Sequence, residues 1–387
     1  MYTLLWCIYS LQSILGISGI IAQGVLALVL TMSGYYMLKV LRQYKTPVFL
    51  KCIALFLGVY MIYTYLSFLD PTPIYVEFDM ATPITATASL KPVLMSLLPV
   101  YAYYYFVRIQ LIKRIEPYLY ICLLLATAQF FIQEKILMME TVAMGVEREE
   151  FTNNIAYDFV HLIPFLFVIG KKKLLRQYVL LLYILCFILL GMKRGAILIG
   201  AVLALYFLYV SYKSMNNKGR TYIILLSLAV IIGVVVYINY LLETSEYFNY
   251  RIESTMDGAS SGRDMLYAQY LDHMRSRTSV IAFLFGEGIN KTIAITGLYA
   301  HNDWLELGIN FGLLGIVLYL LYFIGLYRAV CKASQTNRTV FHAMMAMSFL
   351  LFATTLFSMS YNAYTLGLQV CMGYSLAMLS NKPTIMA

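Results

Sequence analysis

Charged residues are scarce in this chain. Asp, Glu, Lys and Arg make up 12% of the sequence, whereas apolar and aromatic residues make up 61%. Because a soluble domain carries about 25% charged residues, this composition excludes a soluble globular protein. Apolar runs of about 20 residues, long enough to cross a bilayer as helices, recur through the sequence. The chain is therefore predicted to be an all-α, polytopic integral membrane protein.

Cysteine and histidine are also few. The six cysteines fall in predicted helices or in a predicted cytoplasmic loop and form no Cys-x-x-Cys motif, and the four histidines are scattered. This pattern favours neither a disulfide framework nor a metal site. Redox and metal chemistry are therefore not expected, and we predict no metal and no cofactor.

The sequence shows no internal repeat, Pro-rich linker or low-complexity tract. Its N-terminus is apolar from Tyr2 onward and lacks the basic region of a cleavable signal peptide. We therefore expect the first apolar segment to be retained as a helix.

Apolar runs predict about twelve transmembrane helices, with ten or eleven as alternatives. Their ranges are 2–16, 19–39, 47–69, 89–106, 117–132, 153–170, 177–191, 195–212, 221–241, 303–326, 339–359 and 361–380. The chain then divides into N-terminal helices (1–241), a long extracytoplasmic loop (242–302) and C-terminal helices (303–387). The long loop is expected to contain short helices, one of them from Gly262 to Ser276. Two acidic loops, 70–88 and 133–152, are expected on the same side of the membrane as the long loop, where they could cover a site formed there.

The distribution of charge predicts the topology. Basic clusters recur at every second connection, which by the positive-inside rule faces the cytoplasm. Of the 19 acidic residues, only Glu116 falls in such a connection. Both termini are therefore expected inside, and the net charge of +9 needs no nucleic acid to explain it. The basic clusters are Lys39, Arg42 and Lys45; Arg108, Lys113 and Arg114; Lys171, Lys172, Lys173 and Arg176; Lys213, Lys218 and Arg220; and Arg328, Lys332 and Arg338.

Two polar segments on the predicted outer side carry arginine. Lys193 and Arg194 form a turn between apolar helices, against the positive-inside trend. They are either snorkelling side chains that meet lipid phosphates or an anion site, since the planar guanidinium of arginine matches phosphate. The segment Ser260 to Asp264 is either a helix N-cap with an Arg263–Asp264 salt bridge or a phosphate site at a helix N-terminus.

A third polar segment, His301 to Trp304, lies where the long loop returns to the membrane. His301 stands beside Asn302 and Asp303, and it is either a capping residue or a general base. The Gly-x-x-x-Gly spacing of Gly308 and Gly312 is expected to let another helix pack closely.

Two arginines and a histidine on one outer face predict a glycosyl-transfer site. Arg194 and Arg263 would stabilise the leaving diphosphate of a lipid-linked sugar donor in place of a metal. His301, which titrates in the required range, would take the proton of the acceptor hydroxyl. The residues expected to bind substrate are Lys193, Ser261, Glu287, Asn302, Asp303 and Trp304.

The order of these motifs resembles the O-antigen ligase/polymerase superfamily. The resemblance covers about residues 190–320 and rests on Lys-Arg-Gly, Ser-Gly-Arg, Gly-Glu-Gly-Ile and His-Asn-Asp-Trp-Leu-Glu, followed by Phe-Gly-Leu-Leu-Gly. It implies a metal-independent transferase in the bacterial inner membrane, with undecaprenyl-diphosphate-linked glycans as donor and acceptor on the periplasmic side. It carries Arg194, Arg263 and His301 over as functional positions. Membrane lipids are expected partners, a chain-length regulator is a candidate partner, and no nucleic acid is expected.

Three functions remain open at this point. The first, which we favour because the sequence shows no acceptor-specific feature for lipid A, is a surface-polysaccharide polymerase that moves a growing lipid-linked chain onto the next lipid-linked repeat unit. The second is an O-antigen ligase that moves the finished chain to lipid A-core, and nothing in the sequence identifies the acceptor decisively. The third is a transporter or flippase of lipid-linked sugars. It is disfavoured because acids other than Asp158 lie in loops or at helix ends rather than at the midplane.

Overall fold

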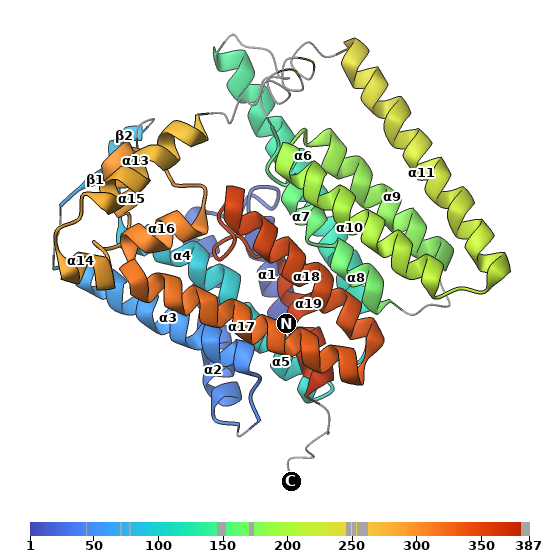
Figure 1. The fold of residues 1–387 in the computed structure, drawn as a ribbon, viewed down its shortest axis with the longest axis horizontal. Coiled ribbons are helices and arrows are strands. Elements are labelled where there is room, and N and C mark those ends of the chain that lie inside the picture. Colours follow the sequence, from blue (N-terminus) through green and yellow to red (C-terminus); the bar gives the residue numbers. More distant parts are fainter. Residues whose placement is uncertain are drawn as a thin grey trace. The chain divides into compact units, whose positions relative to one another are not determined.

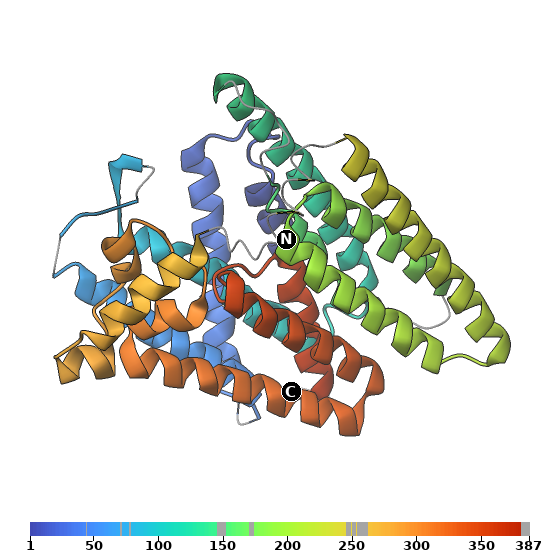
Figure 2. The same cartoon turned by 45° about the horizontal axis from the view of Figure 1, so that its top comes forward.

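The chain divides into two compact units. Unit 1 comprises Met1–Val29 and Arg114–Ala259, and unit 2 comprises Leu30–Lys113 and Ser260–Ala387. Both units consist mainly of α-helices (Figures 1 and 2), which confirms the predicted all-α class. The predicted division into 1–241, 242–302 and 303–387 follows membrane topology and stays a prediction. The computed structural model describes residues 1–43, 45–69, 72–76, 79–144, 152–169, 174–244, 249, 253 and 262–380.

Seven helices in these ranges are long and apolar enough to cross a membrane. Each overlaps a predicted apolar segment, so the multi-pass architecture is confirmed by helix length and composition, whereas the count of twelve stays a prediction. Two of the seven extend well beyond their predicted ends: one continues to Met144 into the predicted outer loop 133–152, and one continues to Thr336 beyond the predicted end at 326. The seven are α2 (Gly19–Leu41), α3 (Val48–Ser67), α6 (Glu116–Met144), α10 (Arg194–Lys213), α11 (Asn217–Thr244), α17 (Gly312–Thr336) and α18 (Arg338–Phe357).

Three other predicted segments are shorter than expected or interrupted, and the predicted segment 303–326 is itself interrupted before α17. Proline explains two interruptions, because Pro99 and Pro164 lie in the first turn of a new helix, where a missing amide hydrogen is tolerated. The helices of these segments are α1 (Tyr2–Ser10), α4 (Ala86–Leu97), α5 (Pro99–Arg108), α7 (Ala156–Val160), α8 (Ile163–Val168) and α16 (Asp303–Asn310), which α17 follows. Two further apolar helices are α9 (Leu174–Leu190) and α19 (Leu366–Leu379).

In unit 1, α9 packs against α7, α8 and α10, and α10 packs against α11. Figure 1 shows α9, α10 and α11 side by side in green to yellow. The rings of Phe130, Phe159 and Phe187 join α6, α7 and α9, with centroids 4.6–6.2 Å apart. Phe187 stands one turn before Gly191, so this aromatic cluster fixes the end of the helix from which the Lys193–Arg194 turn leaves.

In unit 2, two helix pairs approach closely at glycines. A Cβ at Gly325 of α17 would lie 2.9 Å from the Cα of Phe49 in α3. A Cβ at Gly373 of α19 would lie 2.7 Å from the Cβ of Tyr103 in α5. Small residues allow this close packing of helices that lipid surrounds. The α3–α17 and α5–α19 pairs therefore form the centre of unit 2.

The described part of the segment 242–302 contains short helices, as predicted, and its extracytoplasmic location stays a prediction. They are α13 (Arg263–Arg275), α14 (Val280–Phe285) and α15 (Lys291–Thr296). A hairpin of β1 (Ile74–Val76) and β2 (Asp79–Ile84), which was not predicted from the sequence, packs through β1 against α15. Ser89 also donates a hydrogen bond of 2.7 Å to Asn290, just before α15. The described part of residues 72–89 therefore lies beside the segment that contains α15, and the outer location of both stays a prediction.

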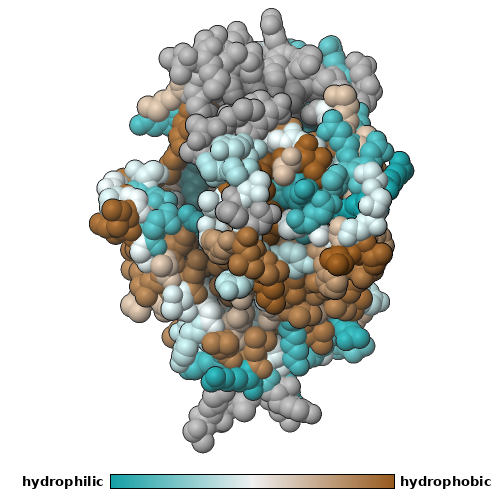
Figure 3. Space-filling view, turned by 90° about the vertical axis from the view of Figure 1, so that its left-hand side faces the viewer, coloured by the Kyte–Doolittle hydropathy of each residue, from teal (hydrophilic) through white to brown (hydrophobic). Residues whose placement is uncertain are grey.

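Apolar side chains remain exposed on the helices of unit 2. Leu55 and Ile62 of α3 and Leu320 and Ile324 of α17 are 46–58% exposed. Figure 3, which faces the side of Figure 1 that carries α3 and α14, shows an apolar band with hydrophilic residues above and below it. Such a band fits contact with lipid tails.

Candidate functional site

Arg263 is the first residue of α13, and Gly262 before it has a left-handed φ of +77°. The expected helix from Gly262 to Ser276 is therefore confirmed. Ser261, an expected substrate-binding residue, lies outside the described residues, as does Ser260.

Tyr267 connects Arg263 to the histidine segment. It lies one turn after Arg263, and its hydroxyl donates a hydrogen bond of 3.2 Å to the backbone oxygen of His301. Burial raises the pKa of Tyr267, whereas the positive charge of Arg263 and a hydrogen bond with Asn302 lower it. Arg263, His301 and Asn302 therefore surround one tyrosine. Tyr267 was not predicted from the sequence, although its i, i+4 spacing from Arg263 on a helix could have indicated it.

His301 is exposed and has a φ of +50°. Non-glycine residues in this left-handed region cost energy and cluster at functional sites. Capping is performed by Asn302, whose side-chain oxygen accepts from the amides of Trp304 (3.0 Å) and Leu305 (3.2 Å). Asn302 also donates to the backbone oxygen of Leu356 at the end of α18 (3.2 Å). Asn302, and not His301, therefore caps α16.

Asp303 and Trp304 point from α16 into unit 2. Asp303 is fully buried, and its carboxylate accepts from the hydroxyl of Tyr319 and from the amide of Ser360 (3.0–3.1 Å). The Trp304 indole donates to the hydroxyl of Thr355 (3.0 Å). These contacts anchor α16 to α17 and α18. The predicted substrate contacts of both residues stay predictions.

Glu287 lies in a polar network with Arg277, His273 and Lys291. Its carboxylate is 2.7 Å from Arg277, 2.8 Å from His273 and 3.4 Å from Lys291. Hydrogen bonds from His273 and Arg277 lower the pKa of Glu287, although burial alone would raise it. The network was not predicted, because Arg277 and His273 carried no motif. The predicted contact of Glu287 with substrate stays a prediction.

Arg277 ties this network to α16. Its side chain is 6% exposed, and it donates to the backbone oxygens of Gly308 (2.9 Å) and Ile309 (3.0 Å) at the end of that helix. The amide of Glu287 also donates to Ile309 (3.1 Å), and the amide of Gly288 donates to Asn310 (3.0 Å). The chain from Arg277 to Gly288 therefore satisfies carbonyls that α16 leaves open at its C-terminus.

The predicted helix 303–326 is interrupted at Phe311, between α16 and α17. Gly312 has a φ of +62°, and a Cβ there would lie 2.4 Å from the amide nitrogen of Gly286. A Cβ at Gly308 would instead lie 3.2 Å from the flexible end of the Met274 side chain. The expected close approach of another helix at Gly312 is confirmed, because the backbone of Phe283 and Leu284 in α14 would lie 2.7–2.8 Å from the same Cβ.

Lys193 and Arg194 belong to unit 1. Lys193 is the N-cap residue and Arg194 the first residue of α10, and both are half-buried. Gly191 before them lies against the segment that leads into α7: a Cβ there would be 2.7 Å from the Cβ of Ala156, and its carbonyl accepts from Asn153 (3.0 Å). The turn is therefore well fixed within its own unit.

The structure thus brings Arg263, His301 and Asn302 together around Tyr267 in unit 2. Asp303, Trp304 and Glu287 lie in the same unit and connect to α16, whereas Lys193 and Arg194 lie in unit 1. The combination of Arg194 with Arg263 and His301 in one site stays a prediction.

Residues 179–320 match the family model described as O-Antigen ligase. This match includes Arg194, Arg263 and His301, and it confirms the resemblance found in the motifs. No curated protein matches the chain. Members of the family are glycosyltransferases that act on lipid-linked glycans. Residues 179–320 are therefore similar to the O-antigen ligase family, and the chain that carries them is a multi-pass membrane protein by helix length and composition.

Proposed function

We propose that this protein is a surface-polysaccharide polymerase of the bacterial inner membrane. It moves a growing glycan from its undecaprenyl diphosphate carrier onto the next lipid-linked repeat unit, on the periplasmic side. Ligation of the finished chain to lipid A-core uses the same donor chemistry and is the alternative that the experiment below distinguishes.

The observation that carries the proposal is the arrangement of His301 and Arg263 around Tyr267. His301 is exposed and has a left-handed φ, and Asn302 rather than His301 caps α16. The positive charge of the Arg263 guanidinium acts on Tyr267, which also contacts His301. A base and an anion-stabilising group beside the same tyrosine suit a reaction in which a hydroxyl loses a proton while a diphosphate leaves.

The reaction is a substitution at the anomeric carbon of the donor sugar. The acceptor hydroxyl oxygen forms the new glycosidic bond as its proton passes to the imidazole of His301. The bond between the anomeric carbon and the diphosphate oxygen breaks, and the lipid diphosphate leaves with both electrons. Arg263, together with Arg194 and Lys193, stabilises the charge that grows on this leaving group.

Exposed apolar side chains on α14, which lies in the chain between Arg277 and Glu287 of the polar network, support a lipid-linked donor. Val280, Ile281, Phe283 and Phe285 of α14 are 50–72% exposed, and α14 packs against α17, which has spanning length. A short apolar helix next to a polar cluster suits a substrate that is part lipid and part sugar.

The test is His301→Ala in a strain that lacks the native gene, with His342→Ala of α18 as the matched histidine control. Loss of a positioned base should lower turnover about 10²–10⁴-fold, while the amount of protein in the membrane stays normal. Arg263→Ala should also abolish transfer, and Arg263→Lys should rescue poorly because lysine offers a point charge rather than a fork. Arg275→Ala, at the other end of α13, is the arginine control.

The glycan pattern of the inactive variant identifies the reaction. A polymerase lesion leaves surface lipid with a single repeat unit, whereas a ligase lesion leaves none and accumulates long chains on the carrier lipid. Near-normal surface polysaccharide from His301→Ala would refute the catalytic role of this histidine.

A further inference from the structure

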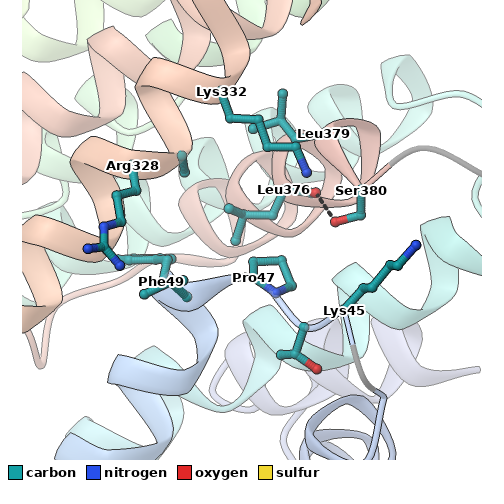
Figure 4. A pocket seen from close by; sticks show the side chains of 12 residues that line it. Lys45, Pro47, Phe49, Arg328, Lys332, Leu376, Leu379 and Ser380 are labelled. Carbon is teal, nitrogen blue, oxygen red and sulfur yellow. Dashed lines mark hydrogen bonds between the residues drawn. The ribbon is translucent and has the colours of Figure 1, made fainter.

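Unit 2 contains a cavity far along the chain from the histidine segment. Its volume is about 230 Å³, and it lies where α3 begins, α17 approaches its end and α19 ends (Figure 4). Its lining comes from the residues around the start of α3, from the second half of α17 and from the end of α19.

Three cations line this cavity without a carboxylate. Lys45, Arg328 and Lys332 are exposed, and the lining contains no acidic residue. None of the ion pairs found in the described part of the chain includes these three side chains. In Figure 4, Lys45 and Arg328 lie on opposite sides of Pro47, and the amino group of Lys332 points toward Ser380. The cavity therefore has a net positive charge contributed by two separate chain segments.

The start of α3 adds to this positive character. Pro47 is its N-cap residue, and no side chain caps the first amides. The hydroxyl of Thr46, which could have done so, instead donates to the carbonyls of Val40 and Gln43. An uncapped helix N-terminus carries partial positive charge and favours an anion.

The remaining wall of the cavity is apolar. Pro47, Phe49, Leu376 and Leu379 line it, and Gly325 brings α17 against the backbone of α3. An apolar wall with a cationic rim suits a ligand that joins a negative group to an apolar body. A small soluble metabolite would need polar groups where these side chains stand.

We propose that this cavity binds the phosphate of an anionic phospholipid headgroup. The positive-inside pattern predicts the start of α3 and the ends of α17 and α19 on the cytoplasmic side, which is opposite to the catalytic cluster. Basic pockets between membrane helices on that side bind anionic headgroups. A free phosphate ester shares the same chemistry, and the experiment separates the two sources. The headgroup site does not depend on the proposed transferase activity.

The experiment measures binding of phosphatidylglycerol to the purified full-length protein by native mass spectrometry, with phosphatidylcholine as the zwitterionic comparison. The test variant carries Lys45→Gln, Arg328→Gln and Lys332→Gln. The control variant carries Arg42→Gln, Lys113→Gln and Arg338→Gln, which removes the same charge from exposed residues outside the cavity. Each lining cation should contribute about fivefold to affinity, so the test variant should bind about a hundredfold more weakly.

Competition with inorganic phosphate and glycerol 3-phosphate identifies the source. A lipid site resists both competitors, whereas displacement of the lipid by either one shows that the cavity takes soluble phosphate compounds and overturns the headgroup assignment. Equal affinity of the test and control variants for phosphatidylglycerol overturns the proposal altogether. If the triple variant does not fold, Lys332→Gln alone is the test variant, and its affinity for phosphatidylglycerol should fall about fivefold.

Discussion

Substitution of Arg277 by methionine tests the network that holds α16. The guanidinium is almost fully buried, at 6% exposed, and makes three hydrogen bonds: to the Glu287 carboxylate at 2.7 Å, to Gly308 at 2.9 Å and to Ile309 at 3.0 Å. Methionine keeps much of the volume and removes every donor. The variant leaves two helix-terminal carbonyls and one carboxylate without this partner.

The expected loss of stability is about 3 kcal/mol. Removing one partner of a buried ion pair costs about 3–5 kcal/mol, because the other charge stays buried. Two observations place Arg277→Met at the lower end: Glu287 is 19% exposed, and it keeps His273 and Lys291 as partners. For a compact unit of this size, 3 kcal/mol corresponds to a fall of roughly 6–12 °C in the unfolding temperature.

The assay is thermal unfolding of the purified protein in detergent, and the chain offers a matched control. Arg275 pairs with Asp272 at 3.4 Å, both within α13, but both side chains are more than 70% exposed. Such a surface pair contributes about 0–1 kcal/mol, so Arg275→Met should barely change the unfolding temperature. Equal unfolding temperatures for Arg275→Met and Arg277→Met would refute the reasoning. If Glu287 contacts substrate as predicted, Glu287→Gln should also lower transfer more than its change in stability explains.

Two further predictions concern the same region. Hydrogen bonds from His273 and Arg277 lower the pKa of Glu287 although burial alone would raise it, so its stabilising contribution is present above the ordinary glutamate pKa of about 4.3 and is lost as pH falls through the lower folded value. Thermal unfolding should therefore show a stability difference between parent and Glu287→Gln near neutral pH that shrinks in acid, and a difference that grows in acid would contradict it. Gly312→Ala should cost about 2–4 kcal/mol, because its Cβ would lie 2.4 Å from the Gly286 nitrogen at a left-handed φ. Gly308→Ala meets only the flexible end of Met274 and should cost under about 1 kcal/mol; similar unfolding temperatures for the two variants would refute the close approach.

The sequence by itself determined the all-α class, the positions of the seven long apolar helices and the resemblance of residues 179–320 to the O-antigen ligase family. Each depends on local composition, which apolar run length and motif order report directly. The helix that begins at Arg263 and the polar character of the His301 segment were predicted for the same reason. The position of Pro99 was visible in the sequence as well. That it begins a new helix, and so interrupts the predicted segment 89–106, became clear only from the structure.

Only the tertiary structure decided which side chains meet. Tyr267 contacts His301, Arg277 contacts the end of α16, and Lys45 shares a cavity with Lys332. These partners are separated by tens to hundreds of positions, and no local pattern encodes them. The physical reason is that a hydrogen bond or a cavity exists only after packing has fixed two distant backbones, whereas hydrophobicity and helix capping act within a few residues of one chain segment.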